Sequence, residues 1–174
     1  VYIPLEEFKL LLTLRAPAHI LLAASMYFCA ELLQKEESGS TAILDYAWCF
    51  VAFVFVSVET NDLFERWRLY ADGDMRDLLS YKRFLTLSIV WLAYALALNF
   101  FCNERQRHAW RHAGLAIAAL AVLVGVFAGI SFNPIELFTF LLNYRVLTLV
   151  LLIAGMVTLT RLRAETLHFG VQAR

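Results

Sequence analysis

The stretch YAWCFVAFVFVSVETNDLFERWRLY, residues 46–70, decides the class of fold. It carries no charge from Tyr46 to Val58 and then gains Glu59, Glu65 and other charged residues within a few helical turns. An uncharged run of this kind is typical of a helix inside a bilayer, and aromatic residues mixed with charges mark the place where such a helix leaves the lipid. The stretch therefore predicts a membrane-spanning helix with carboxylates at its end.

The composition of the whole chain also indicates a membrane protein. Of the 174 residues, 61% are hydrophobic and only 17% are charged, and the mean hydropathy is +0.65. A soluble domain is about 45–50% apolar and about 25% charged. The 15 Lys and Arg residues equal the 15 Asp and Glu residues in number, so no net field favours nucleic acid, and the lipid bilayer is the expected partner. Cys29, Cys49 and Cys102 form no C-x-x-C pair and are expected to be buried structural thiols.

Five apolar segments are candidates to cross the hydrocarbon core, which needs about 20 mostly apolar residues. They are residues 17–33, 42–58, 84–101, 114–132 and 144–162. A single helix from Pro134 to Leu162 would be about 43 Å long, so we expect the last segment to enter the membrane near Tyr144 instead. The sequence predicts an all-α, polytopic transmembrane helical bundle that forms one domain over residues 1–174.

The orientation of these segments rests on the positive charges beside them. Five spans would give the two sides of the membrane nearly equal numbers of Lys and Arg, so the positive-inside rule does not separate them by number. The clusters RQRHAWRH and TRLR lie closest to their spans, which favours a cytoplasmic C-terminus. The localisation we expect is a bacterial inner membrane.

Three carboxylates at membrane depth form the candidate polar site: Glu59, Asp45 and Glu31. Burying a charge in lipid costs free energy, so an ionisable group in a spanning helix suggests a functional role. Glu59 lies on the last apolar turn with no evident local partner. If the three converged in a bundle they could carry protons or cations, although Asp45 and Glu59 stand at opposite ends of one predicted helix.

The simpler interpretation of this region is a helix leaving the bilayer. Asp62 and Arg66 are four residues apart, and Glu65 and Arg68 are three apart, so each pair would lie on one helical face. Aromatic residues and paired charges after an apolar run are typical of the membrane boundary. We favour this interpretation for the stretch as a whole, and Glu59 is the residue that it does not explain.

A metal site is a less favoured alternative. Glu104, His108 and His112 are spaced four apart, so a continuous helix would place them on one face, and such ligands suit zinc or non-haem iron. The nearby Arg105 and Arg111 would repel a cation. We therefore predict no metal and no cofactor.

Two signatures of membrane enzymes are also absent. The segment DGDMRD, residues 72–77, lacks the spaced acids of the alcohol phosphotransferases that make phospholipids. Ser25, Ser57 and Ser88 lack the setting of an intramembrane protease nucleophile and are expected to bond their own helix backbone. No catalytic residue is assigned.

Small residues spaced four apart predict close helix packing. Gly114 and Ala118 form one such pair, and Gly125 and Gly129 form another, both in the segment GLAIAALAVLVGVFAG. Small side chains let two backbones approach, which supplies contacts that lipid cannot supply. Ala93 and Ala97 are expected to do the same in the third span.

The C-terminal half carries a resemblance to a known family. The segments SIVWLAYALALNFFCNERQRHAWRHAGLAIAALAVLVGVF, residues 88–127, and LLNYRVLTLVLLIAG, residues 141–155, combine a Trp/Tyr-bearing span, an Arg-rich turn and an L-N-x-R-x-L motif. Over about residues 84–160 the chain resembles a family of many-helix bacterial predicted membrane proteins catalogued as a domain of unknown function. The resemblance implies a many-helix membrane fold and no established reaction. Members often place a Lys at the position of Gly125.

Three functions follow as hypotheses. The first is a structural or accessory subunit of a larger membrane assembly. For the chain in general, the expected protein partners are other membrane subunits or a second copy of the chain. The second is a transporter or carrier of a proton, an ion or a lipid-like molecule past Glu59, Asp45 and Glu31. The third is a membrane metalloenzyme that uses Glu104, His108 and His112. The scarcity of catalytic signatures favours a protein that is not an enzyme.

Overall fold

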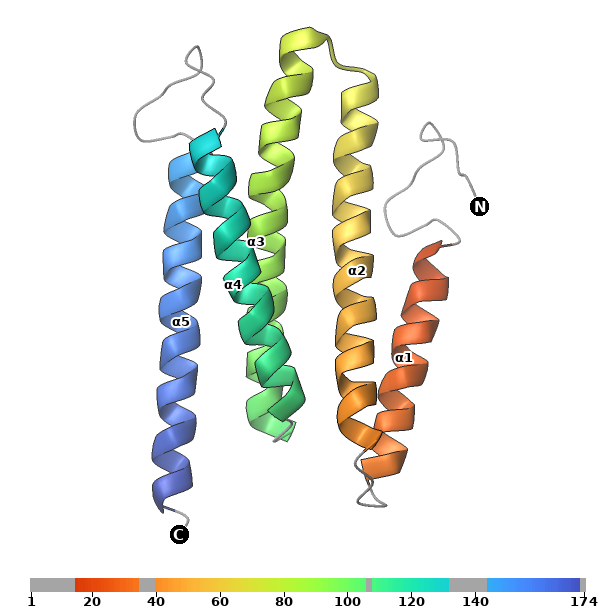
Figure 1. The fold of residues 1–174 in the computed structure, drawn as a ribbon, viewed down its shortest axis with the longest axis vertical. Helices are drawn as coiled ribbons and strands as arrows, with labels where there is room; N and C mark the ends of the chain where they lie inside the picture. The colour runs from red at the N-terminus through yellow and green to blue at the C-terminus, as the bar shows by residue number, and fades with distance from the viewer. Residues whose placement is uncertain (1–14, 35–39, 106–107, 132–143, 173–174) are drawn as a thin grey trace. The chain divides into compact units, whose positions relative to one another are not determined.

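The computed structural model describes residues 15–34, 40–105, 108–131 and 144–172. These residues form five α-helices: α1 (Arg15–Gln34), α2 (Ser40–Leu69), α3 (Gly73–Arg105), α4 (His108–Ser131) and α5 (Tyr144–Gln172) (Figure 1). Within the described ranges every residue is helical except Tyr70, Ala71 and Asp72, which connect α2 to α3. The prediction of an all-α chain is confirmed.

Four helices are long and apolar enough to cross a bilayer, and they indicate an integral membrane protein. The segments are Ala16–Leu33, Thr41–Leu69, Met75–Cys102 and His108–Ile130. They correspond to the first four predicted spans. The fifth predicted span, residues 144–162, lies on α5, which is not among these four, so its crossing of the membrane stays a prediction.

The turn between α2 and α3 explains why these helices extend beyond their predicted spans. Arg66 and Arg68 lie in the last turn of α2, where positive charge favours the helix C-terminus. Asp72 directly precedes α3, and its carbonyl oxygen accepts a hydrogen bond of 3.0 Å from the Arg76 N–H. Charges that suit both helix ends let the helices continue past the apolar segments into the polar turn.

The chain divides into two compact units, Val1–Arg83 and Phe84–Arg174. In the first unit, α1 and α2 lie side by side (Figure 1), and aromatic contacts fix their register. The rings of Tyr27 and Trp48 lie 5.8 Å apart edge to face, and those of His19 and Phe55 stack at 5.5 Å. Residue numbers fall along α1 as they rise along α2, so the two helices are antiparallel. The prediction of one domain stays a prediction.

The second unit packs the remaining helices through one buried stripe on each, which we call the packing stripes. They are Ser88, Leu92, Ala95 and Asn99 on α3; Gly114, Ala118, Ala121, Gly125 and Ala128 on α4; and Thr148, Leu152, Gly155 and Leu159 on α5. Neighbouring members are alternately four and three residues apart. This is the heptad spacing of helices that pack at shallow angles of about 20°.

The stripe of α4 consists only of Gly and Ala, so its neighbours approach its backbone closely. A Cβ atom at Gly125 would lie 2.6 Å from Leu152 Cδ1 and 3.0 Å from Ser88 Oγ. The α4 backbone therefore contacts α3 and α5 at the same level. Leucines of α3 and α5 complete this core, in which Leu92 and Leu152 are both 3% exposed.

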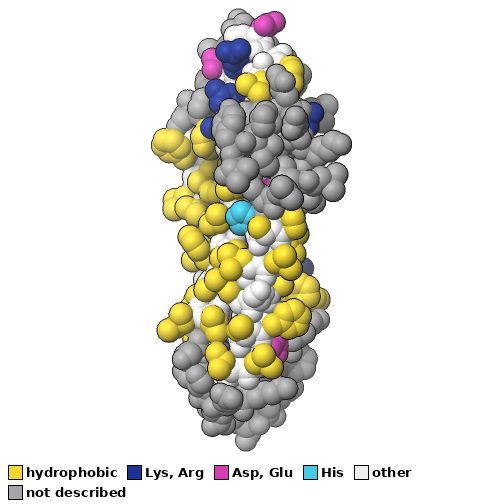
Figure 2. Space-filling model, turned by 90° about the vertical axis from the view of Figure 1, so that its right-hand side faces the viewer, with side chains coloured by type: hydrophobic (Ala, Val, Ile, Leu, Met, Phe, Trp, Pro, Cys, Tyr) yellow, Lys and Arg dark blue, Asp and Glu magenta, His cyan; other side chains and the backbone are white. Residues whose placement is uncertain are grey.

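The surface of the described helices is largely apolar, as a lipid environment requires. On the face in Figure 2, hydrophobic side chains cover the middle of the helices, and most of the visible Lys and Arg lie toward the upper end. Large side chains such as Leu21, Phe28 and Phe50 are more than 60% exposed. Cys29 is also exposed, which corrects the prediction that all three cysteines are buried; Cys49 and Cys102 are buried as expected. Cys29 adjoins Phe28 on this apolar surface and needs no protein cover there.

Candidate functional site

The three predicted carboxylates do not form one cluster. Asp45 and Glu59 are fourteen residues apart on α2, which is about 21 Å along a helix axis. The register that sets His19 beside Phe55 and Tyr27 beside Trp48 brings Glu31 to the level of the N-terminal end of α2, near Asp45. Glu59 lies at the other end of the α1–α2 pair. Within this chain Glu59 therefore lies apart from Asp45 and Glu31, and a functional role for the three carboxylates stays a prediction.

Asp45 and Glu59 nevertheless share the side of α2 that faces α1. A rotation of about 100° per residue places Glu59 within about 20° of Trp48 and about 40° of Phe55 around the helix axis, and both of these rings contact α1. The two carboxylates are nearly fully buried, at 6% exposed for Asp45 and 5% for Glu59.

Glu59 is also not the isolated charge that its sequence position suggests. It takes part in a polar or electrostatic interaction, as do Asp45, Glu31 and His19. Buried charges in a membrane helix are usually tolerated because other protein groups compensate them. The α1–α2 contact therefore holds engaged polar groups at both of its ends, with aromatic contacts between them.

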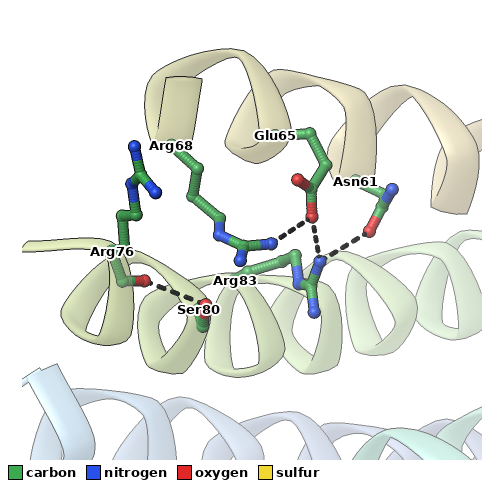
Figure 3. Close-up of polar contacts among 6 residues, drawn as sticks. All are labelled: Asn61, Glu65, Arg68, Arg76, Ser80 and Arg83. Atoms are coloured by element: carbon green, nitrogen blue, oxygen red, sulfur yellow. Dashed lines mark hydrogen bonds and ion pairs between the residues drawn. The ribbon is translucent and has the colours of Figure 1, made fainter. Parts of the chain in front are cut away.

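A second polar cluster joins α2 to the beginning of α3 (Figure 3). Arg83 on α3 donates from Nη1 to Glu65 Oε1 at 2.5 Å and to Asn61 Oδ1 at 3.3 Å. Arg68 donates from Nη1 to the same Glu65 oxygen at 2.7 Å. The predicted pairing of Glu65 with Arg68 is thus confirmed, whereas the role of Arg83 was missed. We call these four residues the arginine cluster.

The signal for Arg83 lies in the shortness of the turn. Only Tyr70, Ala71 and Asp72 separate α2 from α3. In an antiparallel pair with so short a connection, residues equally far from the turn lie level with one another. Asn61 and Arg83 are both eleven residues from Asp72. The sequence could have paired them once the ends of both helices were known.

The residues of the proposed metal site belong to two helices. Glu104 is in the last turn of α3, and His108 begins α4, so Glu104 and the two histidines do not share one helical face. His108 and His112 are both exposed, and the Glu104 side chain lies outside the described part. Among the described residues no group of three His, Cys, Asp or Glu side chains is arranged to hold a metal ion.

The predicted packing residues have different roles. Gly114, Ala118 and Gly125 belong to the packing stripe of α4. Gly129 is buried, but no described atom lies within 4 Å of an added Cβ, so a methyl group there would meet open space. The contact at Gly155 was missed, because that residue has no small partner four positions away and its neighbour is a leucine, Leu92. Ala93 and Ala97 are exposed, and the buried alanine of that helix is Ala95, which corrects their prediction.

Two buried polar side chains of the second unit, Ser88 and Asn99, are satisfied by backbone carbonyls of their own helix. Ser88 Oγ donates to the Leu85 carbonyl at 2.8 Å, and Asn99 Nδ2 donates to the Ala95 carbonyl at 2.8 Å. The expectation for the three serines is confirmed, since Ser25 and Ser57 likewise bond the carbonyl one turn before them, at 2.6 and 2.7 Å. Buried hydroxyls of this kind add no reactive group to the core.

An apolar groove of about 560 Å³ lies on the second unit. Its walls are Phe84 of α3 with Leu123, Val124, Phe127 and Ala128 of α4. These lining residues bear no titratable side chain. The groove can accommodate a hydrocarbon group but supplies no acid, base or nucleophile from these walls.

Comparison of the chain with protein-family models, with curated proteins and with solved structures found no match.

Proposed function

We propose that this integral membrane protein is a structural or accessory subunit of a larger membrane assembly. The proposal rests on one observation: the packing stripes of α3 and α5 both pack against the packing stripe of α4. Gly125 of α4 contacts both Ser88 and Leu152, and the buried polar groups Ser88 and Asn99 bond backbone carbonyls of their own helix. A core of this kind supplies rigidity and shape rather than a polar pathway.

The second candidate is a carrier, and the burial of Asp45 and Glu59 favours it. Carboxylates at membrane depth are costly, and proteins that retain them often move protons or ions. Their separation along α2 weakens this candidate, since a relay across about 21 Å needs intermediate polar groups. Two residues between them whose rings contact α1, Trp48 and Phe55, are aromatic.

A metalloenzyme is the least favoured of the three functions, because Glu104 and the two histidines lie on different helices. Membership in the bacterial family of unknown function, an inner-membrane location and a cytoplasmic C-terminus remain part of the proposal. The sequence features that support them are the Arg-rich turn and the L-N-Y-R-V-L motif.

Proton flux into liposomes separates the first two functions. The purified chain is reconstituted with a pH-sensitive dye inside the vesicles, as wild type, Glu59→Gln and the control Asp77→Asn, an exposed acid of α3 outside the candidate site. The subunit proposal expects all three to leak no faster than empty vesicles under an imposed pH gradient. Flux in the wild type that disappears in Glu59→Gln and persists in Asp77→Asn would establish the carrier instead.

A further inference from the structure

We infer that the turn between α2 and α3 is the surface by which this chain binds an extramembrane segment of another subunit. The inference rests on the proposed function, because it assigns a binding surface within that assembly. Large hydrophobic side chains that are 47–70% exposed gather at this turn, which we call the hairpin tip: Trp67, Leu69, Tyr70 and Met75. Exposed groups of large apolar side chains mark interaction sites, and Trp, Tyr and Met are enriched in protein interfaces.

The beginning of α1, the middle of α2 and the beginning of α3 mark one boundary of the hydrocarbon core. The ring contact between α1 and α2 sets Arg15 level with Glu59, and Arg83 of α3 donates a hydrogen bond to Asn61 of α2. Arg15, Glu59 and Arg83 are each the first charged residue beside an uncharged run of at least thirteen residues. Because the three lie at nearly the same level, the hydrocarbon core ends close to Glu59.

Helices α2 and α3 continue past this boundary and carry the hairpin tip out of the bilayer. Trp67 is eight residues beyond Glu59, about 12 Å along the helix axis, and Leu69 is ten residues beyond it, about 15 Å. The headgroup layer adds only about 5–8 Å to each side of the hydrocarbon core. The hairpin tip therefore stands beyond the headgroups, where lipid does not cover its apolar side chains.

The hairpin tip also has a fixed shape. The arginine cluster links α2 to α3 just before the tip (Figure 3). Within the tip, the Tyr70 N–H donates to the Trp67 carbonyl at 3.3 Å, and Arg76 Nε donates to the Ala71 carbonyl at 2.8 Å. A surface that is already ordered loses little conformational entropy when it binds a partner.

The charge of the hairpin tip favours a basic protein surface over the surface of a membrane. The segment YADGDMRD, residues 70–77, contains three aspartates and one arginine, which gives it a net charge of −2. Asp72 and Asp77 are both exposed. A membrane surface that contains anionic lipids repels an acidic segment. A protein surface with Lys or Arg around an apolar pocket complements both the charge and the hydrophobic side chains of the tip.

The first part of the test is photo-cross-linking of the whole chain in its own membrane. The photoreactive residue p-benzoylphenylalanine replaces Tyr70, and mass spectrometry of the cross-linked peptides identifies what the tip touches. We expect a cross-link to a segment of a different subunit that lies outside the membrane. The matched control is the same replacement at Tyr46, which is 44% exposed at the other end of α2 and should not cross-link to that segment.

The second part measures how much the hairpin tip contributes to binding. Native mass spectrometry gives the fraction of the chain that carries the cross-linked subunit, for wild type, Tyr70→Ser, Met75→Ser and the control Tyr46→Ser. We expect the dissociation constant to rise at least about tenfold in both tip variants, as for the anchor residues of an interface. The circular dichroism of these variants should match the wild type, because both side chains are exposed.

The possible failures of the inference and of the proposed function can be told apart. A complex that keeps its affinity in Tyr70→Ser and Met75→Ser would overturn the inference and leave the subunit function standing. A cross-link from position 70 only to lipid, or only within the chain itself, would do the same. A wild-type chain that carries no other subunit would overturn both.

Discussion

Gly125 and Gly129 differ although they form one small-residue pair on α4. A Cβ at Gly125 would come within 2.6 Å of Leu152 Cδ1 and 3.0 Å of Ser88 Oγ, whereas at Gly129 no described atom lies within 4 Å. We predict that Gly125→Ala destabilises the protein by about 1–3 kcal/mol through overpacking. Gly129→Ala should be neutral or stabilising by up to about 1 kcal/mol, because Ala favours a helix over Gly.

Unfolding of both variants in detergent, followed by circular dichroism, checks this prediction. Equal stabilities for Gly125→Ala and Gly129→Ala would show that the contacts at Gly125 do not restrict its size. The pair also shows what a small-residue motif can predict. It marks a face on which close approach is allowed, but only the neighbouring helices determine which member is used.

The same limit explains the error at Ala93 and Ala97. The third span contains several small residues, and those on different faces satisfy the same spacing rule. The face that packs is set by Ser88, Leu92 and Asn99, whose burial depends on α4 and α5. Ala95 lies on that face and is fully buried, while Ala93 and Ala97 are on the exposed side.

At the scale of the helices, α3 and α5 contact each other where the side chain of Leu92 packs against Gly155. A Cβ at Gly155 would lie 2.9 Å from Leu92 Cγ, so an added methyl group competes with a fully packed leucine. We predict that Gly155→Ala costs about 1–3 kcal/mol. Leu92→Ala alone costs about 2–5 kcal/mol because it leaves a cavity.

The double variant tests whether these two residues touch in the folded protein. Gly155→Ala should be less harmful in the Leu92→Ala background, since the new methyl group occupies space that the leucine has left. The coupling free energy from the four proteins is expected to be about 0.5–3 kcal/mol. Strict additivity of the two single effects would contradict the contact between α3 and α5.

The sequence predicted which segments form helices, but it did not predict how far those helices extend. Apolar runs of about 20 residues give helices in a bilayer because the backbone must satisfy its own hydrogen bonds there. Hydropathy measures only the apolar part, so the predicted second span ended at Val58 while α2 continues to Leu69. The polar extension carries Glu65 and Arg68, which is why the arginine cluster was only half visible in the sequence.

For the whole molecule, the number of spans fixes the sides on which the helix ends lie. Five crossings would place His108 and Arg161 on one side of the membrane and Asp72 on the other. All three side chains are exposed in the structure. We predict that single cysteines at His108 and Arg161, in a chain without its native cysteines, react with an impermeant maleimide from the same side.

A cysteine at Asp72 should react from the opposite side. The assay compares sealed spheroplasts with inverted membrane vesicles. Labelling of the Arg161 position on the side of Asp72 would mean that α5 does not cross the bilayer, leaving the four apolar helices as the only spans of the described chain.

The central claim is that this chain serves as a subunit of a larger membrane assembly. Its most direct test is native mass spectrometry of the protein extracted from its own membrane in mild detergent. The account predicts a stable complex whose mass equals this 19.9 kDa chain plus one or more different protein chains. Recovery of the chain alone, or only with copies of itself, would contradict the subunit function and favour the carrier.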